Sequence, residues 1–295
     1  MSHLQRLKTV LIKVLLALAA IIGAGLLYRW LLFPALMWAF APGDAVALEL
    51  RRFGILLFAL LGYCAYVRVV EKRAPRELLP APLASGLGLL SGSALMLLAI
   101  VPLFALGAYE VTAQPGLRDG VFAVAGFILI AAMLEEVLYR GVLFQALEQQ
   151  WGTLPAMWLQ ALIFGLAHVR NVVMIDGGVW DVVATVVSVT LLGVLWSLLF
   201  AYTRNLWVSG LHHTAWNLTI LLSGVPLSGN DDWRSVAPLL TEYRAPDWLT
   251  GGLFGPENAI LTLLLVSVAV AVMTRRMQQR GRLLRGDHAQ LAPAR

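Results

Sequence analysis

The sequence predicts an all-α fold: a polytopic helical bundle of about eight transmembrane helices that forms a single integral membrane domain over residues 1–295. Hydrophobic residues make up 59% of the chain and charged residues only 13%, whereas soluble domains carry about 25% charged residues. The mean hydropathy is +0.77. At ~20 residues per span the chain has room for about eight spans, but not for a separate soluble domain.

The first candidate helix covers about 10–40 and contains Arg29 and Pro34. We therefore expect a kinked helix, or a span followed by an interfacial segment. Its apolar run is too long for the h-region of a cleaved signal peptide, so we expect a retained span. Residues 78–82 (Leu-Leu-Pro-Ala-Pro) are typical of an interfacial linker before the third helix.

The other candidate helices follow from hydropathy alone. A motif-bearing core at about 121–223 is flanked by helices at about 10–109 and 259–273. In chain order, the remaining candidates lie at about 53–70, 83–109, 121–147, 154–173, 182–202, 206–223 and 259–273.

The positions of the basic residues predict that both termini lie in the cytoplasm. Basic residues precede the first span, follow the second, separate the sixth from the seventh and follow the eighth, so an even number of spans places them on one side. The loop at 224–258 then faces outward. Arg51 and Arg52 disagree, because they fall at the outer end of the second span. The residues that favour this orientation are Arg6, Lys8, Lys13, Arg68, Lys72, Arg73, Arg76, Arg204, Arg275, Arg276, Arg280, Arg282 and Arg285.

The net charge of +5 is explained by these helix ends and the C-terminal tail, which contact anionic headgroups. We therefore expect the lipid bilayer as a partner and no nucleic acid. The single cysteine, Cys64, allows no internal disulfide. The preference for Arg over Lys, with abundant Ala, Leu and Trp, is typical of a GC-rich bacterial genome, so we expect a bacterial inner (cytoplasmic) membrane.

Three charged residues, Glu135, Glu136 and Arg140, interrupt the fourth apolar segment. A charge at the bilayer centre costs at least ~2.5 kcal/mol on insertion scales, so such residues usually mark a functional site. Glu136 and Arg140 are four residues apart and can pair on one helix face. Glu135 points about 100° away and needs another partner or a raised pKa. The simplest structural explanation is a salt bridge beside one protonated glutamate.

Two further polar groups lie in later spans. Phe164 and His168 share a face of the fifth span, and His213 and Asn217 share a face of the seventh. Taken singly, a histidine in an apolar helix is more often a hydrogen-bonded core residue, and His with Asn often joins helices. Taken together, one carboxylate, two imidazoles and a carboxamide at mid-membrane depth make a site that can hold and activate water. His212 points elsewhere.

These three groups, in this order, resemble the signature of the CPBP family of intramembrane proteases, also called the CAAX-protease and bacteriocin-processing, or ABI, family. Its pattern is Glu-Glu-x-x-x-Arg, Phe-x-x-x-His and His-x-x-x-Asn. This chain has Glu135-Glu136-Val-Leu-Tyr-Arg140, Phe164-Gly-Leu-Ala-His168 and His213-Thr-Ala-Trp-Asn217, without a departure. The resemblance covers roughly 121–223, and His212 matches no motif position.

The resemblance implies endoproteolysis within the membrane, on a membrane-associated protein or peptide. Glu135 would activate the nucleophilic water, assisted by His168. His213 and Asn217 would hold the oxyanion or the same water, while Glu136 and Arg140 would brace the helix. Eukaryotic members cut prenylated C-terminal tails, and that specificity does not carry over to a bacterial chain.

The resemblance also implies a water activated by glutamate without a metal, so we expect no cofactor. Zinc is the alternative, because two His and two Glu can supply its ligands. The sequence has no His-Glu-x-x-His motif, and adjacent glutamates on a regular helix cannot both face one ion without distortion.

Two other functions stay open at this point. A bacteriocin-immunity or scaffold protein would need the same fold but no cleavage, and its phenotype would survive Glu135→Gln. A proton- or ion-coupled transporter would use the same polar groups. Against a transporter, no internal repeat or pair of broken helices is visible, and the polar residues cluster instead of crossing the bilayer.

Overall fold

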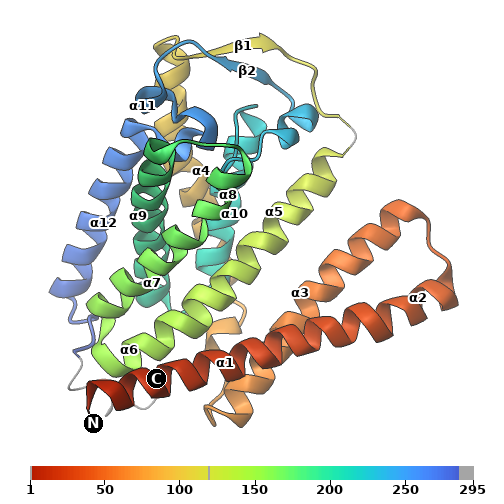
Figure 1. Cartoon of the computed structure of the whole chain (residues 1–295), viewed down its shortest axis with the longest axis vertical. Coiled ribbons are helices and arrows are strands. Elements are labelled where there is room, and N and C mark those ends of the chain that lie inside the picture. Colours follow the sequence, from red (N-terminus) through yellow and green to blue (C-terminus); the bar gives the residue numbers. More distant parts are fainter. Residues whose placement is uncertain (1, 119, 286–295) are drawn as a thin grey trace.

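The structure is a computed structural model that describes residues 2–118 and 120–285. It is a bundle of long helices with one small sheet at one end (Figure 1). Its elements are α1 (His3–Leu27), α2 (Phe33–Phe40), α3 (Asp44–Val69), α4 (Pro82–Ala105), β1 (Tyr109–Ala113), α5 (Val121–Glu136), α6 (Gln145–Trp151), α7 (Thr153–Ala167), α8 (Val169–Met174), α9 (Val179–Thr203), α10 (Leu206–Leu222), β2 (Leu240–Tyr243), α11 (Asp247–Thr250) and α12 (Ile260–Gln279).

The predicted all-α membrane bundle is confirmed, but the count of eight spans is not. Among the described residues, six continuous helical segments are long and apolar enough to cross a membrane. Helices α3 and α10 lie where the second and seventh spans were predicted, but they are not among these six; α10 has only 17 residues. The six are His3–Phe40, Pro82–Ala105, Val121–Trp151, Thr153–Met174, Val179–Thr203 and Ile260–Gln279.

The first helical segment is one continuous rod of 38 residues, His3–Phe40. Its irregularity is a π-helical turn at Tyr28–Leu32, directly before Pro34 in the first turn of α2. A π-bulge and a proline are both known causes of helix kinks, and both lie in the segment where a kink was predicted, but the helical segment continues to Phe40. Figure 1 shows that α2 and the start of α3 project away from the rest of the bundle.

The glutamate-bearing helix is also irregular. Helix α5 ends at Glu136 and continues through a π-helical segment, Val137–Phe144, into α6. Hydropathy predicted one helix at about 121–147, without this π-helical segment. π-helical turns occur frequently at functional sites, and this one carries Arg140.

Close backbone contact fixes α10 against α4. A Cβ atom on Gly88 would lie 2.6 Å from the Val208 carbonyl oxygen, and one on Gly92 would lie 2.2 Å from the His212 carbonyl oxygen. Only a residue without a side chain allows this approach, which is typical of small-residue helix contacts in membranes. The contact sets the position of the helix that carries His213 and Asn217.

The loop between α10 and α12 folds back on the bundle. Strands β1 and β2 pair antiparallel, with Tyr109 opposite Tyr243, and join this loop to the α4–α5 connection. Phe254 from the same loop is buried in a hydrophobic cluster with Phe164 and Trp196. The small sheet was not predicted from the sequence.

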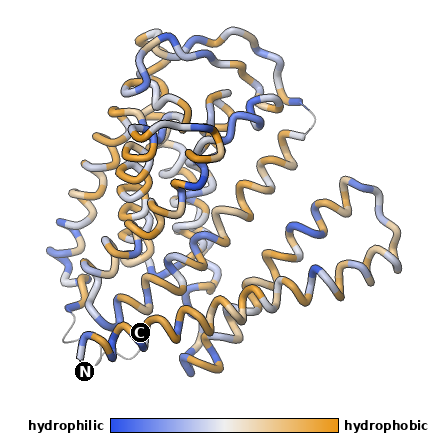
Figure 2. Tube along the Cα trace, viewed as in Figure 1, coloured by the Kyte–Doolittle hydropathy of each residue, from blue (hydrophilic) through white to orange (hydrophobic). Residues whose placement is uncertain are grey.

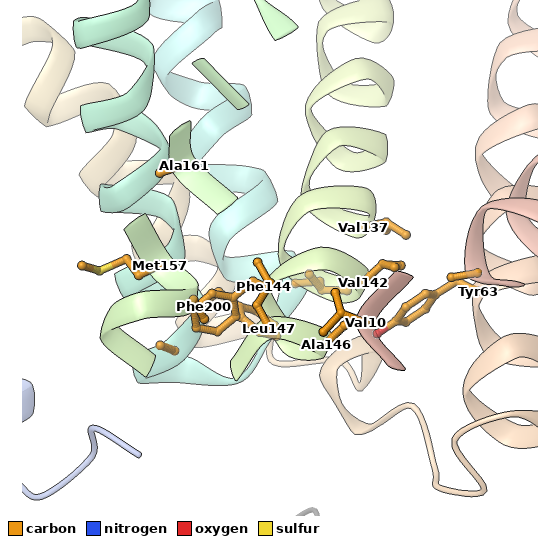
Figure 3. Close-up of a cluster of buried hydrophobic side chains, with 14 of the residues drawn as sticks. Val10, Tyr63, Val137, Val142, Phe144, Ala146, Leu147, Met157, Ala161 and Phe200 are labelled. Carbon is orange, nitrogen blue, oxygen red and sulfur yellow. The ribbon is translucent and has the colours of Figure 1, made fainter. Parts of the chain in front are cut away.

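A second hydrophobic cluster lies at the opposite end of the bundle, where Phe144 and Phe200 meet edge to face (Figure 3). Many large apolar side chains on the helices are exposed, and Figure 2 shows that apolar residues predominate along these helices. This suits contact with lipid.

The start of α1 and the segment after α12 lie at one end of the bundle, away from the sheet. Arg6 donates to the Gln150 carbonyl oxygen at 2.8 Å, and Thr153 exchanges hydrogen bonds with Leu284 at 3.0 Å. The two ends of the described part of the chain, near residues 6 and 284, therefore lie at the same end of the bundle. In the first half of α3, Arg52 pairs with Glu49 at 3.0 Å. The charge of Arg52, which disagreed with the predicted orientation, is therefore locally neutralised.

Candidate active site

Glu136 and Arg140 form the predicted ion pair. Arg140 Nη1 lies 2.8 Å from Glu136 Oε1, and neither side chain has any solvent exposure. Arg140 also donates to the Gly193 carbonyl oxygen on α9 at 3.1 Å, and its guanidinium lies over the Phe164 ring at 4.8 Å. The pair therefore joins α5, α7 and α9 around one buried point.

His213 lies between the two glutamates. Its Nδ1 is 3.2 Å from Glu136 Oε1, and its Nε2 is 3.9 Å from Glu135 Oε2. Glu136 also accepts from Arg140, so it acts as a carboxylate, and His213 Nδ1 must carry the hydrogen in this contact. The Nε2 atom is left facing Glu135, whose side chain is 35% exposed. His213 is thus the side chain from another helix that lies near Glu135, although 3.9 Å is longer than a hydrogen bond.

His168 lies at the break between α7 and α8, where the helix backbone is interrupted. Its Nδ1 is 2.9 Å from the Phe164 carbonyl oxygen. A carbonyl oxygen only accepts, so Nδ1 is the donor, and Nε2 offers a lone pair whenever the ring is neutral. The Phe164 ring contacts the rings of both His168 and Tyr139 edge to face, with centroids at 4.5 and 4.7 Å.

Asn217 lies one helical turn after His213 on α10 and is half-buried. Its Oδ1 atom is buried and has no hydrogen-bond partner among the described residues. Buried amide oxygens are normally paired, so Asn217 is an exception within the site.

The structure adds Trp196 from α9, which the sequence analysis did not select. Its ring stacks on His213 with centroids 3.7 Å apart and planes at 23°. Trp residues of membrane proteins are enriched at the interfaces. A Trp in the middle of an apolar span was therefore a signal that could have been used.

Glu257 is the second residue that was missed. It lies in a 3₁₀ turn, Pro256–Asn258, after the sheet, and is 3% exposed. Its Oε2 accepts from the Ser228 hydroxyl at 2.6 Å, and the Ser228 carbonyl oxygen accepts from Asn171 at 3.0 Å. Burial raises the pKa of Glu257, opposed by the Ser228 hydrogen bond and the nearby charges of His168 and His213. No motif or spacing in the sequence marks this residue.

Metal ligands are not grouped in the described part of the chain. No set of three or more His, Cys, Asp and Glu side chains converges there as a metal site requires. An apolar cavity of about 950 Å³ lies between α2 and α3, lined by residues such as Tyr28 and Phe53. None of the motif residues lines that cavity, so it has no part in this site.

Comparison with protein families gives one match. Residues 117–219 match the family model described as "Type II CAAX prenyl endopeptidase Rce1-like". The matched segment is about a third of the chain and contains all three motifs. No curated protein and no solved structure gives a match. Residues 117–219 thus match an Rce1-like type II CAAX prenyl endopeptidase domain, in agreement with the CPBP, or CAAX-protease, family that the three motifs predicted.

Proposed function

We propose that this chain is an intramembrane endopeptidase that hydrolyses a peptide bond of a membrane-associated protein or peptide with a water activated by Glu135. The observation that carries the proposal is the position of His213, whose two ring nitrogens face Glu136 and Glu135 at 3.2 and 3.9 Å. A half-exposed carboxylate beside an oriented imidazole supports general-base chemistry.

In this mechanism Glu135 takes a proton from water, and the resulting hydroxide attacks the scissile carbonyl carbon. His168 assists, because its Nδ1–H is bonded to Phe164 and its Nε2 is free to accept from the same water. Glu135 then returns the proton to the leaving nitrogen as the C–N bond breaks.

The oxyanion of the tetrahedral intermediate needs donors that are fixed before the reaction. We assign this role to His213 and Asn217. The His213 Nε2 atom faces Glu135 and can donate when it carries a hydrogen, and the Asn217 carboxamide lies one turn further along α10. Glu136 and Arg140 orient His213 and do not react.

The experiment is a comparison of new protein termini in membranes that express wild type or Glu135→Gln at equal levels. Glu110→Gln, on the exposed sheet where Glu110 pairs with Arg244, is the matched control. Termini that require Glu135 and survive Glu110→Gln establish the protease and name its substrates. If wild type and Glu135→Gln give the same termini in membranes of the native organism, the proposal is wrong. A non-proteolytic immunity or scaffold role is then favoured.

We further propose that the reaction needs no metal. Among the described residues, no three or more His, Cys, Asp and Glu side chains converge as a metal site requires, and Glu136 Oε1 is already bonded to Arg140. The expected result is that cleavage by the purified protein survives exhaustive treatment with a zinc chelator. Zinc that is bound in proportion to activity, and that is lost in His168→Ala, would overturn this assignment.

A further inference from the structure

His212 is a buried histidine that no motif and no step of the proposed reaction uses. It adjoins His213 on α10 but is 4% exposed and faces α9. Its only side-chain hydrogen bond within the described residues joins its Nδ1 to the indole Nε1 of Trp196, at 3.1 Å. The question is what this contact does for the neighbouring site.

The chemistry of the contact fixes the state of both rings. An indole N–H can only donate, so His212 Nδ1 is the acceptor and the ring proton lies on Nε2. A buried Trp normally has a partner for its N–H, because an unsatisfied buried donor costs about 1–3 kcal/mol. The His212 ring is therefore the acceptor that holds the Trp196 indole in one rotation.

The fixed rotation of the Trp196 indole also affects the orientation of His213. The indole and the His213 imidazole stack at 3.7 Å with planes at 23°, so the plane of one ring limits the plane of the other. His213 Nε2 is 3.9 Å from Glu135 Oε2, beyond the usual hydrogen-bond distance of about 2.7–3.2 Å. A small rotation of the His213 ring therefore decides whether Nε2 faces the reacting water.

We propose that His212 is a positioning residue of the protease site: through its hydrogen bond to Trp196 it sets the indole plane that orients the His213 imidazole toward Glu135. The inference rests on the proposed function. His212 touches neither glutamate and no reacting atom, and acts only through Trp196. The two adjacent histidines of α10 thus have different roles: His213 takes part in the reaction, and His212 positions the Trp196 indole.

The test is a double-mutant cycle on a peptide that spans the cleavage site identified in the terminus experiment. His212→Leu removes the acceptor and is expected to lower kcat about tenfold or more, with KM within about twofold, since misplacement of about 1 Å can cost up to 10²-fold. His212→Gln restores an acceptor oxygen and is expected to recover most of kcat. Trp196→Phe keeps an aromatic ring without the N–H donor, and the double variant His212→Leu/Trp196→Phe should be no slower than the worse single variant.

Thr214→Val is the matched control, because the Thr214 hydroxyl is buried on the same helix and bonds only to the Gly210 carbonyl oxygen. If His212→Leu fails to fold, the double variant removes both partners and should recover thermal stability, since deleting a whole hydrogen bond is milder than orphaning one half.

Three results would overturn the assignment. The first is a wild-type kcat in folded His212→Leu, and the second is a His212→Gln variant that does not recover kcat. The third is a double variant whose loss of kcat equals the product of the losses in His212→Leu and Trp196→Phe. Cleavage that requires Glu135 but ignores His212 rejects only this inference, whereas no cleavage by wild type rejects the proposed function.

Discussion

Arg140 is a charged side chain with no solvent exposure, and Glu136 is the carboxylate that neutralises it. Removing one member of a buried pair leaves the other charged in a low-dielectric interior, which typically costs 3–5 kcal/mol. The same pair holds the Nδ1 side of His213. At the scale of single residues, stability and orientation of the site thus depend on one contact.

We expect Arg140→Ala to lower both the yield of folded protein and its thermal midpoint in detergent, by a destabilisation of roughly 3–5 kcal/mol. Arg29→Ala is the control, because Arg29 is exposed on the first rod. Normal yield and heat stability for Arg140→Ala would show that the pair does not stabilise the bundle.

Glu257 leads to a pH-dependent prediction. Burial raises its pKa above the ordinary value of a glutamate, although Ser228, His168 and His213 oppose the shift. A carboxyl group whose pKa is raised in the folded state binds more protons in the folded than in the unfolded protein. The free energy of unfolding of wild type therefore falls as pH rises from the unfolded-state pKa to the folded-state pKa of Glu257. Glu257→Gln should therefore raise the thermal midpoint at neutral pH and make little difference near pH 4.

The measurement is the difference in thermal midpoint between Glu257→Gln and wild type, from about pH 4 to pH 8, the range above the ordinary pKa of a glutamate. Glu242→Gln, which is exposed in the same loop and pairs with Arg244, should give a small, flat difference. A difference that does not grow with pH for Glu257→Gln would mean that the carboxyl group is not destabilised by its burial.

At the residue scale, the sequence predicted the Glu136–Arg140 pair because residues four apart on a helix share a face. The same rule indicated that Glu135 needs a partner from another helix, but could not say which. Trp196 and Glu257 were not predictable in this way. Trp196 approaches the site from α9 and Glu257 from the loop before α12, and neither belongs to a motif. Such contacts depend on helix packing, which local spacing does not encode.

At the scale of elements, helix α4 determines where α10 can lie. Gly92 allows α4 to approach the backbone of His212, one residue before His213. A methyl group there must push α10 outward, and with it two residues of the proposed site. Overpacked contacts of this kind cost typically 1–3 kcal/mol.

We expect Gly92→Ala to lower cleavage at least tenfold and to reduce thermal stability by about 1–3 kcal/mol. Gly86→Ala, on the same helix, should leave both unchanged, because its Cβ would meet nothing within 4 Å. Both variants are compared by initial rate and by thermal unfolding. Equal behaviour of the two would show that α4 does not position α10.

The helices themselves were largely predictable, because long apolar runs must form hydrogen-bonded helices in lipid. Three details were not. The π-helical segment after Glu136 and the break at His168 are deviations within apolar sequence, where hydropathy is uniform. The β1–β2 pairing joins segments more than a hundred residues apart, and neither strand has a distinctive local pattern.

At the scale of the whole molecule, the site is enclosed by parts of the chain that the family match does not include. Residues 117–219 supply the three motifs, but Glu257 and the Phe254 contact come from beyond them. α4, which holds α10 in place, lies before them. The matched segment is therefore one part of a site that the complete bundle forms.

The rod His3–Phe40 has a mechanical consequence for its surroundings. At 1.5 Å per residue its 38 residues extend about 57 Å, nearly twice the ~30 Å thickness of a hydrocarbon layer. Such hydrophobic mismatch is relieved by tilt or by local thickening of the lipid, and Figure 1 shows the rod running obliquely to the other helices. Packing against α3 and the thickness of the host bilayer therefore act together on the inclination of this rod, and lipid chain length becomes a physical variable acting on the shape of the protein.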